Sequence, residues 1–212
     1  MKQALWRLTF GLAESLKRFI DILGSLAALL LFSPVFIATT IAIKLEDGGP
    51  IYFKQMRVGR GGKLFPMMKF RSMVVDADKM KDALMSQNQH GDRAVTFKVK
   101  DDPRVTRVGR VIRKYSIDEF PQFFNVLLGH MSLVGPRPSL RREVTRYKAW
   151  HLRRLKVKPG ITCLWQIGGR GDINFEGQVR LDLRYIASQS LWGDVVILIK
   201  TIPAVIAGKG AY

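Results

Sequence analysis

The sequence contains very little cysteine and histidine. Cys163 is the one cysteine among 212 residues, so an intramolecular disulfide cannot form, and a single thiol is typical of a reducing compartment. The three histidines, His90, His130 and His151, have no partner at metal-ligand spacing. The sequence therefore gives no support for a structural zinc site.

Acidic residues are scarce relative to basic ones. The chain has 35 Lys and Arg residues but only 17 Asp and Glu, which gives a formal net charge of +18 at pH 7. This charge predicts anionic partners: nucleic acid, an acidic membrane surface or phosphorylated small molecules. With 47% hydrophobic and 25% charged residues the composition excludes disorder. A mean hydropathy of +0.03 is too polar for a polytopic membrane protein.

Hydrophobic residues gather near the N-terminus. Residues 1–19 mix basic and apolar side chains in a pattern that predicts an amphipathic helix able to lie on an anionic bilayer. Residues 22–43 are uncharged, and this run is long enough to cross a bilayer core of roughly 30 Å. Ser33 and Pro34 interrupt the run, where proline removes a backbone donor and clashes with the preceding turn.

Two interpretations of this run stay open on the residues alone. Lys17 and Arg18 precede it and Lys44 follows it, and the positive-inside tendency places both flanks on the cytoplasmic side. A helix that breaks at Ser33-Pro34 and returns to the same face satisfies that pattern. A single transmembrane helix with a proline kink satisfies the length and the proline equally well.

The rest of the chain predicts an α/β, helix-dominated domain. A glycine-rich turn at residues 59–62 between two short apolar segments predicts a hairpin and hence a small sheet. Helical patterns cover residues 74–89, 141–156 and 175–206, with short helices between residues 101 and 128. We therefore expect two parts, residues 1–46 with the amphipathic segment and membrane helix, and residues 47–212 as one catalytic domain.

Two adjacent carboxylates in the middle of the chain are the most informative residues. Asp118 and Glu119 follow Arg113 closely, and Pro121 places them at the start of a helix. The helix end and Arg113 should keep Asp118 ionised and able to act as a nucleophile on phosphorus, while Glu119 could hold Mg²⁺ against a diphosphate. The spacing of Ser116 and Glu119 also fits a capping box, which is the purely structural alternative.

Other basic residues are candidates for binding a diphosphate. Lys69 and Arg71 form one cluster and Arg104 belongs to a second, and arginine pairs bidentately with phosphate. For each cluster a solvated basic surface is the alternative explanation.

Several strings along the chain resemble, in order and spacing, the bacterial sugar transferase family, the monotopic polyprenyl-phosphate phosphoglycosyl transferases. They are KRFID (17–21), the Ser33-Pro34 break, GPIYFKQMRVG (49–59), KFRSM (69–73), DPRVTRVG (102–109), SIDEFPQ (116–122), NVL (125–127), MSLVGPRP (131–138) and KPGIT (158–162). The tail segments 190–192 and 209–212 resemble the hexose-transferring branch that starts exopolysaccharide or O-antigen units. Cys163 departs from the usual glycine, and Ile117 from the commoner leucine.

The resemblance implies a two-step reaction. In the family, the Asp of the Asp-Glu pair attacks the β-phosphate of a UDP-sugar and releases UMP, and the phosphosugar then passes to undecaprenyl phosphate. Carried over by position, Asp118 is the nucleophile, and Glu119 together with Asp118 forms the Mg²⁺ site. Arg113 and Arg137 carry over as phosphate-binding residues. Glucose-1-phosphate and galactose-1-phosphate are the expected groups transferred.

The resemblance also implies a location and partners. Ser33-Pro34 carries over as the turning point of a re-entrant helix on the cytoplasmic face of a bacterial inner membrane, among anionic membrane lipids. The expected partners are a UDP-sugar and undecaprenyl phosphate, and a homo-oligomer is left open. Nucleic-acid binding is not expected. Only the net charge would support such binding, and the hydrophobic run would have no role in it. A membrane-anchored scaffold without catalysis is the alternative, and the intact Asp118-Glu119 pair argues against it.

Overall fold

The structure is a computed structural model that describes residues 2–77, 79–80, 102–169 and 173–207. Its α-helices are α1 (Lys2–Leu31), α2 (Ser33–Asp47), α3 (Arg107–Lys114), α4 (Gln122–Leu127), α5 (Arg141–Val144), α6 (Leu164–Gly168), α7 (Phe175–Ala187) and α8 (Leu191–Ala207). The 3-10 helices are η1 (Arg60–Gly62), η3 (Ile117–Glu119) and η4 (His151–Lys156). The strands are β1 (Tyr52–Val58), β2 (Leu64–Phe70), β3 (Ser132–Val134), β4 (Ser139–Leu140) and β5 (Gly160–Thr162). The predicted helix-dominated α/β class is confirmed.

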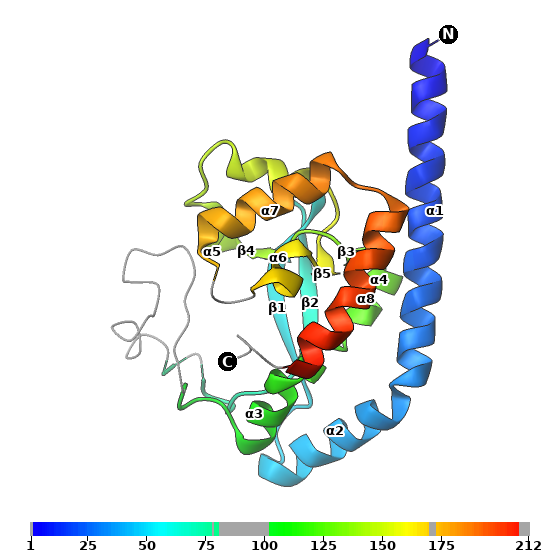
Figure 1. Cartoon of the computed structure of the whole chain (residues 1–212). Coiled ribbons are helices and arrows are strands. Elements are labelled where there is room, and N and C mark those ends of the chain that lie inside the picture. The colour runs from blue at the N-terminus through cyan, green and yellow to red at the C-terminus, as the bar shows by residue number, and fades with distance from the viewer. Residues whose placement is uncertain (1, 78, 81–101, 170–172, 208–212) are drawn as a thin grey trace.

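Two small sheets lie at the centre of the domain (Figure 1). β1 and β2 form the predicted antiparallel hairpin, whose turn uses Gly61 and Gly62 at φ of 66° and 82°, a region that glycine enters without strain. β4 pairs antiparallel with β1, while β3 pairs parallel with β5 in the second sheet. The loop of residues 135–138 follows β3 and precedes β4, so it connects the two sheets. We call it the Arg137 loop.

The main hydrophobic core lies between the hairpin and the helices. Phe65 and Met67 of β2 point inward because side chains alternate along a strand. They pack with Val126 of α4, Tyr185 of α7 and Ile197 of α8. This packing brings β2 next to α4, and therefore next to the carboxylates that precede α4 in the chain.

The N-terminal helices form a bent pair. α1 stands along one side of the domain and α2 runs from its end toward α3 (Figure 1). The predicted break is confirmed: α1 ends at Leu31, Pro34 lies in the first turn of α2, and the axes bend by 60°. No single helix among the described residues has the length and hydropathy to cross a bilayer, whereas residues 11–31 and α2 pass that test only as a bent pair.

Charged residues attach α1 to the domain. Arg18 donates to the carbonyls of Val126 (2.5 Å) and Leu127 (2.7 Å), which lie at the C-terminal end of α4; the Val126 carbonyl also accepts from Gly129 N at 2.9 Å. The buried Asp21 carboxylate accepts hydrogen bonds from Ser132 Oγ and Leu133 N, both at 2.9 Å. α1 is therefore fixed to α4 and β3.

Two predicted helices differ from the structure. Residues 74–77 and 79–80 form turns, and the rest of the predicted 74–89 helix lies outside the described residues. The predicted helix over residues 141–156 is wrong, because it divides into α5 and η4. In the 3-10 geometry of η4 residues three apart lie on one side, which buries both His151 and Arg154. The 175–206 prediction is confirmed apart from an interruption between α7 and α8.

Candidate active site

The Asp118-Glu119 pair lies against β2 at the centre of the domain. Lys69 of β2 donates to Asp118 Oδ2 at 3.1 Å and to Glu119 Oε1 at 2.7 Å. Arg137 Nη1 lies 3.8 Å from the same Glu119 oxygen. Lys69 and both carboxylates are less than a fifth exposed. The structure thus brings together four of the residues that the sequence singled out separately.

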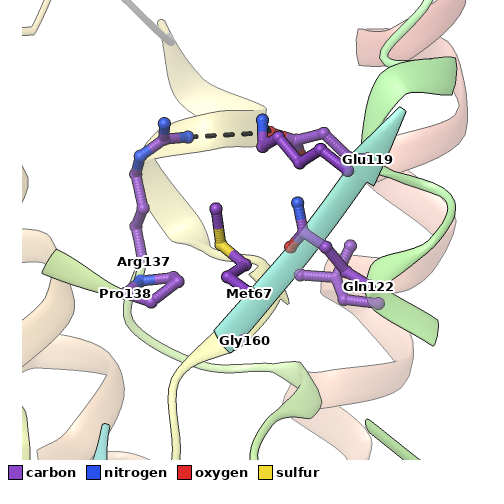
Figure 2. A pocket seen from close by; sticks show the side chains of 8 residues that line it. Met67, Glu119, Gln122, Arg137, Pro138 and Gly160 are labelled. Atoms are coloured by element: carbon purple, nitrogen blue, oxygen red, sulfur yellow. Dashed lines mark hydrogen bonds and ion pairs between the residues drawn. The ribbon is translucent and has the colours of Figure 1, made fainter. Parts of the chain in front are cut away.

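Lys69, Glu119 and Arg137 line a recess, and Asp118 lies next to Glu119 without being part of the lining. Figure 2 shows Arg137 and Glu119 facing each other across it, with Met67, Gln122 and Pro138 nearby. The full lining is Met67, Lys69, Glu119, Gln122, Arg137, Pro138, Gly160 and Ile161. The lining therefore combines three charged side chains with mostly apolar residues and a single amide. Such a combination suits a ligand with an anionic part and a less polar part.

The two carboxylates differ in their proton affinity. Burial raises the pKa of Asp118, and the Glu119 carboxylate adds to this effect against the opposing Lys69 and Arg113. Burial also acts to raise the pKa of Glu119, but Lys69 and Arg137 outweigh it, so that pKa lies below its usual value. Arg113 acts to lower the pKa of Asp118, but burial outweighs it and the pKa lies above its ordinary value.

The chain enters the pair through a strained residue. Ser116 has a φ of 54°, which makes it the one non-glycine residue with positive φ in the described part of the chain. Its side chain makes no capping hydrogen bond, so the capping-box alternative is wrong. Glu119 is bound by Lys69 instead. Backbone strain of this kind is common where the surrounding structure fixes a functional group.

A family model described as bacterial sugar transferase matches residues 12–208. The chain belongs to the bacterial sugar transferase family. It is 49% identical over 92% of its length to the galactosyl transferase CpsE of Streptococcus agalactiae, spanning 43% of that protein. It is 41% identical over 92% of its length to the exopolysaccharide production protein ExoY of Rhizobium meliloti, spanning 88% of it. It is 40% identical over 95% of its length to the UDP-glucose:undecaprenyl-phosphate glucose-1-phosphate transferase of Escherichia coli, spanning 42% of it.

Three predicted phosphate-binding residues, Arg71, Arg104 and Arg113, lie outside the recess lining. Arg71 forms an ion pair with Asp47 and donates through Nε to Pro50 O at 2.6 Å, which ties the end of α2 to β2. Arg104 forms a bidentate pair with Asp102, at 2.8 Å and 2.5 Å. Because both guanidiniums are buried in these pairs, they fix the fold and do not face the candidate site.

Some lining residues of the sugar transferase escaped the sequence prediction. Gln122 lies three residues after Glu119 and reaches the same recess, and this short spacing could have identified it. Met67, Pro138 and Ile161 come from separate segments whose contact depends on the two sheets. The strings that contain Pro138 and Ile161 resemble the family, but nothing in the local sequence marks any of the three as lining a recess.

Magnesium can be judged from the available donors. No group of three or more His, Cys, Asp or Glu side chains in the described ranges is placed to hold a metal ion. Mg²⁺ often takes only one or two protein carboxylates and completes its shell with substrate phosphates and water. Glu119 lines the recess and Asp118 lies next to it, and both carboxylates are bound to Lys69. This donor set fits an ion that arrives with a diphosphate.

Proposed function

We propose that this sugar transferase moves a hexose-1-phosphate from a UDP-sugar to undecaprenyl phosphate and releases UMP, as a first membrane step of exopolysaccharide, capsule or O-antigen synthesis. The observation that carries the proposal is the buried Asp118-Glu119 pair: Lys69 binds both carboxylates, and Glu119 lines a recess together with Arg137. The names of the Streptococcus and Escherichia relatives support UDP-galactose and UDP-glucose as the first donors to test.

The proposed chemistry proceeds through Asp118. Its carboxylate oxygen attacks the β-phosphorus of the UDP-sugar, the bond from that phosphorus to the bridging oxygen breaks, and UMP leaves with the electron pair. The resulting acyl phosphate carries the sugar. A phosphate oxygen of undecaprenyl phosphate then attacks the same phosphorus and displaces the carboxylate, which restores Asp118. Lys69 and Arg137 are placed to bind the negative oxygens of the transferred group.

Glu119, with Asp118, is the proposed Mg²⁺ site. The ion would neutralise part of the diphosphate charge when it is bound. Arg113 of α3 acts electrostatically on Asp118 and is the third proposed phosphate-binding cation. The low pKa of Glu119 keeps this carboxylate ionised and able to serve as a ligand.

A re-entrant membrane segment on the cytoplasmic face of the inner membrane completes the proposal. Near one end of the bent pair Lys17 binds Asp194, and at the other end Asp47 binds Arg71. Both ends are thus attached to the same domain, whereas a straight span would carry them to opposite faces. Large apolar side chains are exposed along the pair, including Phe19, Leu30 and Ile37.

The test is UMP release from UDP-glucose, UDP-galactose and their N-acetyl counterparts, with undecaprenyl phosphate, Mg²⁺ and purified protein in lipid nanodiscs. The expected result is release with one or two donors and a loss of at least about 10³-fold in Asp118→Asn. A folded wild-type sample that releases UMP from no donor would overturn the proposal and favour the scaffold alternative.

A further inference from the structure

The Arg137 loop is held along its backbone from several directions. Gly135 N donates to Thr162 O at 3.0 Å, and Pro136 O accepts from Gly160 N at 2.9 Å. The backbones of Gly135 and Gly160 approach so closely that an added Cβ on Gly160 would lie 2.0 Å from Gly135 N. The first half of the loop is therefore fixed to β5.

Two arginines hold the second half of the loop. Arg154 Nη2 lies 3.4 Å from Arg137 O, and Arg57 Nη1 donates to Pro138 O at 3.2 Å. Arg154 comes from η4 and Arg57 from β1, so they approach from different elements. The two residues are only 4% and 8% exposed. Three successive carbonyls of the loop thus accept hydrogen bonds, two of them from buried guanidiniums.

Fold stability alone does not explain Arg57. Its Nη2 donates to Gln55 Oε1 at 2.6 Å, but its Nε has no partner, and no carboxylate among the described residues lies within ion-pair distance. Burial, with the nearby Arg137 charge, lowers the pKa of Arg57 to about 10. Burying a guanidinium without a paired carboxylate is unfavourable, and an apolar side chain of similar size is often tolerated as well or better.

We propose that Arg57 and Arg154 are positioning residues that fix the Arg137 and Pro138 carbonyls and so aim the Arg137 guanidinium at Glu119 and the recess. The inference rests on the proposed function, because it takes the ligand of Arg137 to be the donor diphosphate. A long, flexible side chain binds a transition state well only when its backbone is held in place beforehand. The two arginines supply that restraint without touching the substrate.

The sharpest test is a double-mutant cycle with Arg57→Met, Arg137→Ala and the double variant, measured by UMP release. We expect Arg57→Met to lower kcat/KM by about 10- to 100-fold. If Arg57 acts through Arg137, the double variant loses no more than about twofold beyond Arg137→Ala alone. Losses that multiply would overturn the inference, since Arg57 would then act independently of Arg137.

A second measurement does not depend on activity. In Arg57→Met, amide hydrogen exchange should become faster in a peptide that covers residues 132–140, while α7 is unchanged and the melting temperature does not fall. Arg57→Lys should recover part of the activity, because a cation and a donor are kept. Arg153→Met is the matched control: Arg153 is exposed and lies beside Arg154 on η4, and its loss should change neither exchange nor activity.

The two proposals fail in different ways. Wild-type protein without UMP release from any donor would overturn the proposed function. An active wild type with unchanged exchange of the Arg137 loop in Arg57→Met would overturn this inference alone. Unchanged kcat/KM in Arg57→Met would also overturn it.

Discussion

Two buried sites in this sugar transferase pair carboxylates with a cation, and they differ in what they can do. At the first, Lys69 serves both Asp118 and Glu119 beside an open recess. At the second, Arg154 binds one carboxylate, Asp182, at 2.5 Å, and neither residue is more than 4% exposed. The second pair is closed to ligands and holds structure. Two carboxylates that share one cation beside a recess therefore indicate a catalytic site more reliably than burial or a shifted pKa alone.

The largest expected effect is a loss of activity without a loss of stability when Asp118 at the first site is replaced. Asp118→Asn should abolish UMP release, by at least about 10³-fold, and leave the free energy of unfolding unchanged or higher, because a buried carboxylate is removed. Activity assays and thermal unfolding of the same sample measure both. If activity falls only in proportion to the amount of folded protein, the first site is structural like the second, and the contrast between them fails.

The second site should lose stability when its carboxylate is removed. Asp182→Ala leaves the Arg154 guanidinium buried without its carboxylate, which should lower the free energy of unfolding by about 3–5 kcal/mol. Chemical denaturation in a fixed detergent measures the change. Asp76→Ala is the control, because Asp76 pairs with Lys79 on the surface and its loss should leave the free energy of unfolding nearly unchanged.

A pH series sharpens the account of Asp182. Burial raises the pKa of this carboxyl from 3.8 to about 6, so between these values the folded state binds more protons than the unfolded state. Its contribution to stability therefore decreases as the pH rises from about 4 to about 6, by up to roughly 3 kcal/mol. The difference between wild type and Asp182→Asn across this range isolates the effect. A flat difference would contradict it.

The smallest expected effect concerns Ser116, whose strained backbone lies just before the carboxylates of the first site. Ser116→Gly should raise the free energy of unfolding by about 1 kcal/mol, because glycine adopts a φ of 54° without strain. Glycine also frees the backbone in other conformations, so activity should stay equal or fall. Thermal unfolding measures the relief of backbone strain, and UMP release measures any damage to the site. A lower free energy of unfolding in Ser116→Gly would contradict the prediction.

The sequence predicted the parts of the site that are local or that belong to recognisable strings. Asp118 and Glu119 are adjacent, and the hairpin that carries Lys69 has a clear turn signal. Arg71 and Arg104 lie in basic segments like that of Lys69, but each forms an ion pair with a carboxylate, Asp47 or Asp102, away from the recess. The role of Arg57 could not be predicted, because its contact to Pro138 joins residues 81 positions apart. Long-range contacts of this kind depend on how the two sheets meet.

The attachment of α1 has a consequence for distance. Arg18 holds the last carbonyls of α4, and the carboxylate pair ends two residues before the same helix begins. α4 has 6 residues and is therefore roughly 9 Å long. If α1 lies at a fixed depth in the bilayer, this short helix limits how far the candidate site can lie from the lipid.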